Sequence, residues 1–198
     1  RYDCLIIPSL STKLILDGMA PGTTEPQYVG GIGNNGMLNL KHFVMEGGTL
    51  VCIDESSNLP IDCFNIPVRN VLYGLPAKAF SCLGSCLRVK VDPQHPVGYG
   101  IPEWTSAYFD GNQAFEVQKS DSAKIAENGD NLVLNLSVVA SYASTDLVQS
   151  GKIRQGEELI SGKPAIVEVK YGKGRIVLFG FEVNRNAQTF GTFRFLFN

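Results

Sequence analysis

The residues best placed for chemistry are Asp54, Glu55 and Ser56, which directly follow the apolar run Thr49–Ile53. In α/β enzymes a nucleophile often stands on a sharp strand-to-helix turn, flanked two positions away on either side by small residues. Asp54 occupies that place, with Cys52 before it and Ser56 after it. An aspartate there can act as a covalent nucleophile, but hydrolysis also needs a positioned base or a metal ion.

The chain supplies little that would serve as that base or hold that metal. Its two histidines are His42, in an amphipathic segment, and His95, in a proline-flanked loop. Neither belongs to an H-x-E pair and there is no C-x-x-C motif, so the sequence predicts no zinc site and no assembled catalytic site. We favour the alternative that Asp54, Glu55 and Ser56 cap the following helix and lie at a solvated sheet edge.

A second candidate motif runs from Gly31 to Gly36 (GIGNNG) and matches the G-x-G-x-x-G pattern of dinucleotide-binding folds. Those glycines turn the chain straight off a strand, so that amides at a helix start meet a pyrophosphate. Here the preceding strand ends at Pro8, and only Tyr28 and Val29 come directly before the glycines. The pattern therefore predicts a flexible loop that enters a helix, and no dinucleotide cofactor.

Composition indicates one globular domain over residues 1–198, because 44% of the residues are hydrophobic and 18% are charged. A net charge of −2 without any cluster of Lys and Arg argues against a nucleic-acid partner. No apolar run approaches the roughly 20 residues that span a bilayer. The chain opens directly on an apolar strand, so we expect it to be an excised piece of a longer protein.

The five cysteines are too few and too scattered for a disulfide-rich scaffold. Cys4 and Cys52 lie in apolar strand patterns and are interpreted as small buried hydrophobic residues. Cys82 and Cys86 are spaced C-x-x-x-C, which leaves a disulfide between them open.

The hydrophobic pattern predicts an α/β fold. Cys4–Pro8 and Thr49–Ile53 are continuous apolar runs, typical of strands buried on both faces of a parallel sheet. Between them we expect a helix that is capped by Asn34 or Asn35 and ends near Glu46, before two glycines. Right-handed crossover makes the two strands parallel.

Later segments are predicted from the same patterns. Leu87–Asp92 alternates like a half-exposed strand, and Leu132–Ala140 forms one or two short strands. Ala165–Val169 and Ile176–Phe181 are split by a glycine-bracketed turn and form a hairpin. A terminal helix is expected from Gln188 onward.

The order of several motifs spans nearly the whole chain. They are YDxLIIPS from Tyr2, GGIG from Gly30, FVxEGGTLV from Phe43, LRVxVDPxHP from Leu87 and GKGRIVLFGF from Gly172. In this order they resemble class I glutamine amidotransferase-like domains. More narrowly, they resemble the non-catalytic version at the C-terminal end of bacterial zinc carboxypeptidase-like proteins. The resemblance implies a flavodoxin-like or Rossmann-like, mostly parallel sheet with flanking helices and a C-terminal β-hairpin.

The chain departs from the family where the chemistry would be. Active glutaminases place a cysteine between glycines at the elbow and a His–Glu pair near the C-terminal part. Here the elbow position is Asp54 between Cys52 and Ser56, and the last strand is followed by EVNR from Glu182, without histidine. The resemblance therefore implies no glutaminase activity and a degenerate elbow at Asp54, Glu55 and Ser56.

The resemblance implies an accessory domain instead. Its partner would be the peptidase domain of the same polypeptide, with the zinc ion held upstream, outside this chain. The parent would be a bacterial periplasmic or secreted metallocarboxypeptidase. Two rivals stay open: a ligand-binding or hydrolytic domain that uses Ser9, Asp54, Glu55 and Ser56 at the strand ends, and a homo-oligomerisation module.

Overall fold

The chain folds around one large mixed sheet. The computed structural model describes residues 2–111, 113–118, 123–127, 130–185 and 189–198. In the described part, the sheet has nine strands in the order β1-β2-β13-β12-β9-β5-β10, with β6 paired to β5 and β8 to β9. Its strands are β1 (Cys4–Ile7), β2 (Thr49–Ile53), β5 (Ser85–Val91), β6 (Trp104–Phe109), β8 (Ala123–Glu127), β9 (Asp130–Tyr142), β10 (Val148–Ser150), β12 (Pro164–Tyr171) and β13 (Gly174–Phe179).

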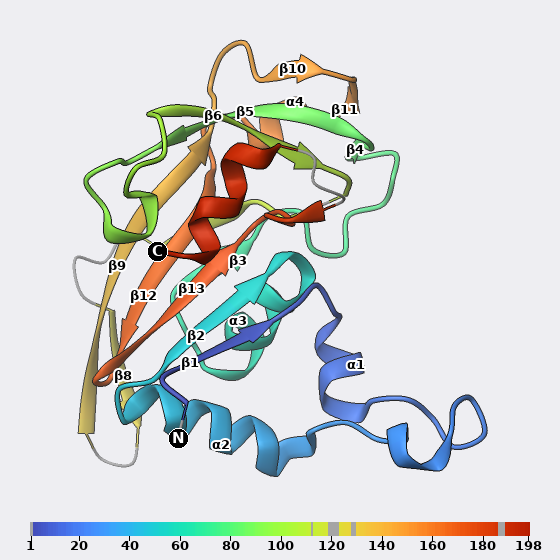
Figure 1. Cartoon of the computed structure of the whole chain (residues 1–198), viewed down its shortest axis with the longest axis vertical. Helices are drawn as coiled ribbons and strands as arrows, with labels where there is room; N and C mark the ends of the chain where they lie inside the picture. Colours follow the sequence, from blue (N-terminus) through green and yellow to red (C-terminus); the bar gives the residue numbers. More distant parts are fainter. Residues whose placement is uncertain (1, 112, 119–122, 128–129, 186–188) are drawn as a thin grey trace.

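Two short ribbons and several helices complete the fold (Figure 1). The ribbons pair β3 (Val68–Asn70) with β7 (Phe115–Val117), and β4 (Ser81–Cys82) with β11 (Ile153–Gln155). The α-helices are α1 (Thr12–Asp17), α2 (Gly33–Met45), α3 (Asn58–Cys63) and α4 (Glu157–Ile160). Short 3₁₀ helices are η1 (Pro26–Tyr28), η2 (Asp54–Ser57), η3 (Pro96–Gly98) and η5 (Phe190–Leu196).

The α/β class expected from the sequence is confirmed, but the sheet is not mostly parallel. Parallel pairing joins β1 to β2 and β2 to β13, whereas the remaining pairs of this sheet are antiparallel. The expected β1–α2–β2 unit is present, and its crossover helix makes the strands parallel. Later strands follow one another through turns such as the one between Tyr171 and Gly174, and a tight turn produces antiparallel neighbours.

Helix α2 begins and ends for backbone reasons. It starts at Gly33, and its N-cap residue Ile32 makes no side-chain cap bond, so the predicted capping by Asn34 or Asn35 is wrong. The C-terminal end agrees with the prediction, because Gly47 has a backbone φ of 114° that residues other than glycine rarely adopt.

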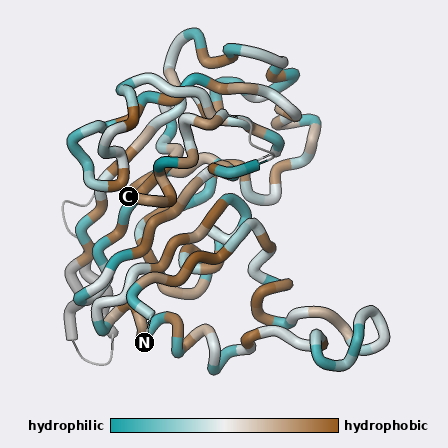
Figure 2. The backbone as a smooth tube through the Cα atoms, in the orientation of Figure 1, coloured by the Kyte–Doolittle hydropathy of each residue, from teal (hydrophilic) through white to brown (hydrophobic). Residues whose placement is uncertain are grey.

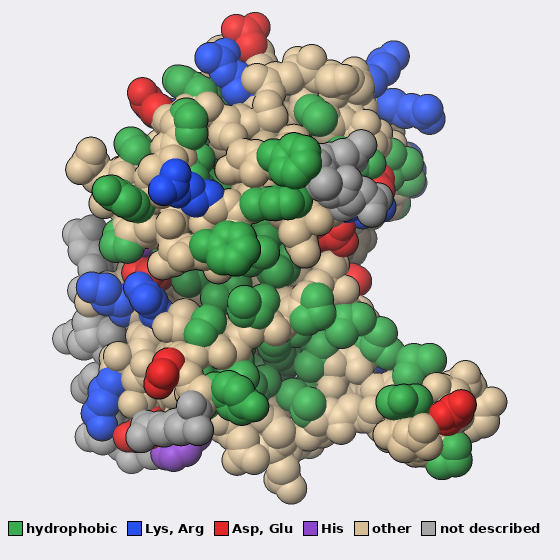
Figure 3. Space-filling view, viewed as in Figure 1, with side chains coloured by type: hydrophobic (Ala, Val, Ile, Leu, Met, Phe, Trp, Pro, Cys, Tyr) green, Lys and Arg blue, Asp and Glu red, His purple; other side chains and the backbone are tan. Residues whose placement is uncertain are grey.

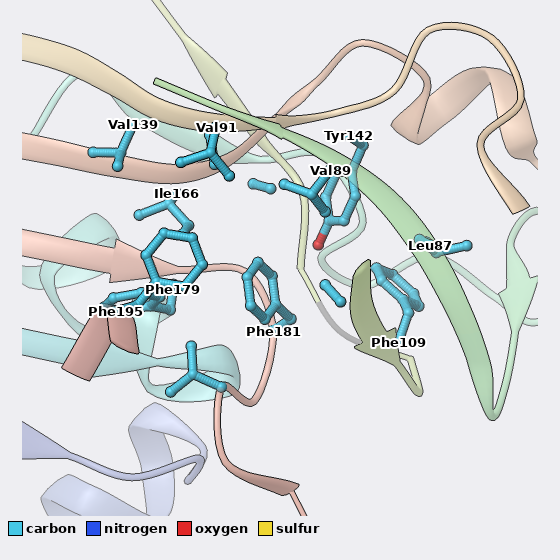
Figure 4. Packing of buried hydrophobic residues seen from close by; sticks show 14 of the residues in the cluster. Leu87, Val89, Val91, Phe109, Val139, Tyr142, Ile166, Phe179, Phe181 and Phe195 are labelled. Carbon is cyan, nitrogen blue, oxygen red and sulfur yellow. The ribbon is translucent and has the colours of Figure 1, made fainter. Parts of the chain in front are cut away.

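Both faces of the sheet carry apolar clusters. Figure 4 shows the one that contains Phe179, Phe181 and Phe195. Val44 of α2 packs with Leu50 and Cys52 of β2 in one cluster, and all three are buried. The other cluster contains Phe179, Phe181 and Phe195 in pairwise edge-to-face contact, with ring centroids 5.9 to 6.4 Å apart. Strands β12 and β13 therefore bury apolar residues on both sides, and Figure 2 shows hydrophobic residues along them.

Strand β1 differs from the sequence prediction, because it is not buried on both faces. Cys4 is exposed and Ile6 is 51% exposed, whereas Leu5 and Ile7 pack with the α2 cluster. Helix α2 covers one face of this sheet edge and leaves the other open. The interpretation of Cys4 as a buried hydrophobic residue is therefore wrong, and that of Cys52 is confirmed.

Three smaller expectations are also settled. All five cysteines are free, so Cys82 and Cys86 do not form a disulfide in this structure. The predicted terminal helix begins at Gln188, outside the described residues, and residues 190–196 form the 3₁₀ helix η5. Within the described residues, no helix is long and apolar enough to cross a membrane.

Between α1 and α2 the chain forms a projecting loop, residues 18–31, which we call the arm (Figure 1). Its two ends are tied together where Gly30 N–H donates to Met19 O at 2.9 Å. A Cβ on Gly18 would lie 1.8 Å from Gly30 O, and one on Gly31 would lie 2.5 Å from Leu16 O. The first glycine of the G-x-G-x-x-G run therefore serves backbone packing at the base of the arm.

Replacing Gly18 with alanine tests this close approach. Both Gly18 and Gly22 have positive φ (69° and 83°), but a Cβ on Gly22 would meet nothing within 4 Å. Positive φ strains alanine at both positions by about 1–2 kcal/mol. The ψ of −156° at Gly18 adds to this strain, since essentially only glycine adopts that combination. We expect Gly18→Ala to lower the free energy of unfolding in urea by about 1–3 kcal/mol more than Gly22→Ala. Equal losses would contradict the packing role.

Candidate functional site

The elbow position is a real feature of the backbone. Asp54 directly follows β2 as the first residue of η2, with a φ of +55° in the left-handed region. Few non-glycine residues adopt this conformation, although Asp and Asn tolerate it best. Strained backbone of this kind gathers at functional sites. The sharp strand-to-helix turn predicted at Asp54 is confirmed.

The Asp54 carboxylate is held in place by two side chains. It is 8% exposed, and its Oδ2 accepts a hydrogen bond from Ser9 Oγ at 2.6 Å. Its Oδ1 accepts from Gln113 Nε2 at 3.4 Å. Ser9 follows β1 and Gln113 precedes β7. The carboxylate therefore joins two segments that are far apart in the sequence.

Behind this pair lies a buried chain of amides. Asn70 Nδ2 donates to Gln113 Oε1 and, at 2.9 Å, to Asn58 Oδ1. Asn58 Nδ2 in turn donates to Glu55 O at 3.0 Å. The hydroxyl of Tyr142 donates to Gln113 O at 2.8 Å. Each partner orients the next, so the network fixes the rotamer of Gln113 and, through it, that of Asp54.

The two serines after Asp54 bind strand ends. Ser56 Oγ accepts from Ile53 N–H at 2.8 Å and lies 3.0 Å from Ile7 O, to which it can donate. Ser57 Oγ is in the same way 3.0 Å from Phe179 O. These hydroxyls bridge the carboxyl ends of β1, β2 and β13.

The capping interpretation of this segment is wrong for Asp54, whose carboxylate bonds Ser9 and Gln113 instead. It is confirmed for Ser56, whose Oγ accepts from the backbone N–H of the N-cap residue Ile53. The expected solvated edge is also wrong, because Asp54 is 8% and Ser56 is 0% exposed. Glu55 alone of the three faces solvent. Ser56 is buried because strand ends converge there and leave backbone carbonyls that need donors. Asp54 is buried because Ser9 and Gln113 donate hydrogen bonds to its carboxylate.

The groups that would activate a nucleophile are elsewhere. His42 is exposed on α2. His95 Nδ1 accepts from Val97 N–H at 3.3 Å and its Nε2 lies 3.1 Å from Ser137 Oγ, which gives the ring a structural task. Burial raises the pKa of the Cys52 thiol far above its ordinary value, so it stays protonated and unreactive. Among the described residues, no three of His, Cys, Asp and Glu gather as a metal site.

An open pocket of about 660 Å³ lies beside the elbow, at the carboxyl ends of the parallel strands. Ser9 connects the pocket to the elbow, since it lines the pocket and donates a hydrogen bond to Asp54. Glu182, Asn184 and Arg185 form the polar part of the lining. Arg185 is already engaged, by Asp110 at 2.9 Å and by Glu182 at 3.4 Å. The pocket thus presents paired charges, a hydroxyl and an amide.

Sequence reasoning found part of this site. Ser9, Asp54 and Ser56 were named together and do lie together, whereas Glu55 points away. Asn58, Asn70, Gln113 and Tyr142 were missed, and no local motif marks them. Asn70 and Gln113 are 7% and 8% exposed. Only their burial reveals the role of these amides.

Comparisons with known proteins support the fold alone. No protein-family model matches the chain, and neither does any curated protein. Among solved structures, two cytoplasmic proteins of Salmonella typhimurium are similar. One is 15% identical with a TM-score of 0.53, over 96% of this chain and 65% of that chain. The other is 17% identical with a TM-score of 0.56, over 99% of this chain and 69% of that chain.

Other solved structures are less similar. A protein described as ThuA-like, from Bacteroides uniformis, is 15% identical over 99% of this chain and 66% of that chain, with a TM-score of 0.45. The β-galactosidase of Bacillus circulans sp. alkalophilus is 12% identical over 90% of this chain and 20% of that chain, with a TM-score of 0.49. Both scores are too low to carry an argument about this chain.

Substitutions at Asp54 separate backbone strain from hydrogen bonding. Asp54→Asn keeps an acceptor for Ser9 and tolerates positive φ, so we expect a loss of less than about 1 kcal/mol. Asp54→Gly relieves the strain but loses both bonds. Asp54→Ala loses both bonds and keeps the strain, so it should cost the most, about 2–4 kcal/mol. Urea unfolding measures all three; Ala as mild as Asn would contradict the network.

Tyr142 predicts how stability changes at alkaline pH. Burial, and then the nearby Asp54 charge, raise the pKa of its hydroxyl well above the ordinary value. The unfolded chain ionises this tyrosine near pH 10, whereas the folded chain keeps it protonated. Its stability contribution is therefore complete below about pH 10 and falls by about 1.4 kcal/mol per pH unit above it.

Tyr142→Phe tests this dependence. At pH 7 the variant should lose about 1 kcal/mol, because Gln113 O loses its hydroxyl donor. Above pH 10 its stability should fall less steeply than that of the wild type, so that the two curves converge. Urea unfolding between pH 7 and 11 measures both curves. Parallel curves over that range would contradict the prediction.

Proposed function

We propose that this chain is a non-catalytic α/β domain of the amidotransferase-like type, which acts by binding and not by hydrolysis. The observation that carries the proposal is the burial and hydrogen bonding of Asp54 at the elbow position. Asp54 keeps the left-handed turn of a displayed nucleophile, yet its carboxylate is 8% exposed and bonded to Ser9 and Gln113. A side chain committed to two neighbours in this way is a structural tie.

The chemical argument agrees with the geometry. Attack on an amide carbon requires a strong nucleophile, and a carboxylate is a far poorer one than a thiolate. General acid–base help is worth about 10²–10⁴-fold, and His42 and His95 are placed elsewhere. An elbow turn without a nearby base supports the proposal that the domain has the fold of the enzymes but does not carry out their reaction.

For the biological context we propose the accessory role implied by the sequence resemblance. In that proposal the domain belongs to a zinc carboxypeptidase and positions the peptidase unit or its substrate. Its support is the order of motifs from Tyr2 to Phe181. The test is the sequence upstream of Arg1 in the genome, where H-x-x-E-type zinc ligands support the role and an unrelated domain opposes it.

The expected lack of glutaminase activity is open to direct measurement. We expect no ammonia release from glutamine by the natural chain, and none after Asp54→Cys, because the base is missing as well as the thiol. Asp54→Asn is the matched control, since it keeps the shape of the elbow. Turnover by the natural chain that Asp54→Asn abolishes, with an unchanged melting temperature, would defeat the proposal.

A second candidate function is supported by the pocket at the strand ends. Open α/β sheets bind ligands outside the carboxyl ends of their strands, and this pocket of about 660 Å³ lies there. Ser9 and the exposed Asn184 provide hydrogen-bonding groups for a small polar molecule.

Thermal melts with L-glutamine, L-glutamate and neutral sugars test this second candidate. A ligand that binds the folded state raises the melting temperature with its concentration. We expect Asn184→Ala to abolish that rise and to leave the melting temperature without ligand unchanged. A rise that survives Asn184→Ala would place the binding elsewhere.

A further inference from the structure

We propose that the pocket at the strand ends is one half of a longer site, which binds a single-chain amphiphile with an uncharged polar head. The other half is an apolar groove of about 250 Å³ between η5 and the sheet. The head lies in the strand-end pocket and the tail lies in the groove. The inference rests on the second candidate function, binding in the strand-end pocket, and adds the tail to it.

The groove and the strand-end pocket adjoin each other. Ile6 of β1 and Leu196 of η5 line both hollows. Ile6 is 51% exposed, so its side chain remains accessible at the junction. Figure 3 shows hydrophobic side chains gathered in a hollow on this face, between η5 and α2. A ligand can therefore extend from one hollow into the other past Ile6.

The groove is lined from two sides by apolar residues. Val51 of β2 and Val177 of β13 line it from the sheet, and Phe195 and Leu196 line it from η5. These residues belong to or pack against one cluster, so η5 covers this side of β2 and β13. Because the groove lies between a helix and a sheet, it fits one narrow apolar chain and not the flat surface of a membrane.

The polar side chains of the groove already have partners. Arg175 Nε donates to Thr49 Oγ1 at 3.3 Å, and Arg175 Nη1 lies 3.6 Å from Oε2 of the buried Glu168. The charge of Arg175 is therefore balanced within the chain, and the groove does not select an anion. An apolar tail beside these groups leaves neither of them without its partner.

The volume of the groove sets the length of the tail. At roughly 30 Å³ each, the liquid volume of one water molecule and nearly that of a methylene group, about eight carbons fill 250 Å³. Each buried methylene tightens binding about fourfold. We therefore expect affinity to rise with chain length up to about eight carbons and to level off beyond that.

The strand-end pocket selects against a charged head. In the described part of the chain, the charged residues that line it are Glu182 and Arg185, which pair at 3.4 Å. Asp110 holds the same guanidinium at 2.9 Å. An anionic head would meet the Glu182 carboxylate and a cationic head would meet Arg185, so each is opposed by a like charge.

The uncharged groups of the pocket fit hydroxyls. Ser9 Oγ donates its proton to Asp54, so towards a ligand it can only accept a hydrogen bond. The exposed Asn184 amide can both donate and accept. A head that carries hydroxyl groups satisfies both side chains, because a hydroxyl is a donor and an acceptor.

Alkyl β-glucosides test the inference by calorimetry, each below the concentration at which it forms micelles. We expect octyl glucoside to bind at least about a hundredfold more tightly than glucose. Affinity should rise about tenfold from hexyl to octyl glucoside and less than about threefold from octyl to decyl glucoside. Octanoate and octyltrimethylammonium, which have the tail and a charged head, should each bind at least about tenfold more weakly than octyl glucoside.

A substitution that fills the groove provides the second arm of the test. Val51→Phe should remove the dependence on chain length and change the affinity for glucose by less than about twofold. Val138→Phe is the matched control, because Val138 is 41% exposed on β9 and lines neither hollow. Cys4→Phe, at an exposed position of the groove lining, replaces Val51→Phe if circular dichroism shows that the latter is unfolded.

The outcomes separate the tail from the head. Octyl glucoside that binds no more tightly than glucose, or a chain-length effect that survives the groove-filling variant, would overturn this inference and leave the second candidate function standing. Octyl glucoside that binds no more tightly than octanol would show that the strand-end pocket does not hold the head, and would overturn both.

Discussion

The structure depends on the convergence of three parallel strands at Asp54. Strands β1, β2 and β13 end side by side, and each leaves backbone groups that have no further ladder partner. Ser56 and Ser57 satisfy Ile7 O and Phe179 O, and Asp54 holds Ser9 through a charged hydrogen bond of 2.6 Å. In a buried setting such bonds are strong, and an unpaired acceptor there would be costly.

That constraint also explains why the elbow does no chemistry in the function we propose. A displayed nucleophile needs an accessible side chain and a base that is free to move a proton. Asp54 is buried, and the groups around it are amides and hydroxyls that orient one another through Gln113 and Asn70. The left-handed turn is kept because it lets the chain pass from β2 into η2 while the carboxylate faces the network. Geometry that displays a nucleophile in other proteins ties strands together in this one.

The same sheet is unequal in its two faces. Helix α2 covers β1 and β2 on one side, and η5 covers only part of the other through Phe195. The result is a partly exposed apolar edge at β1, in a chain whose central strands β12 and β13 are largely buried. Burying an exposed apolar surface of this kind against a partner is favourable, so such surfaces are typical of domains that act by binding.

The sequence by itself determined the α/β class, the β1–α2–β2 unit, the β12–β13 hairpin and the sharp turn at Asp54, because periodicity, glycines and strand length are local signals. Only the tertiary structure decided the rest. Whether Cys4 and Ile6 are buried depends on which layer covers each face of the sheet, and the sequence of β1 does not determine that. The antiparallel pairing of β9 with β5 and with β12 joins segments that are distant in the sequence. Asn70 of β3 and Tyr142 of β9 both bond Gln113, which in turn bonds Asp54, and polar residues acquire such a role only once folding removes them from water.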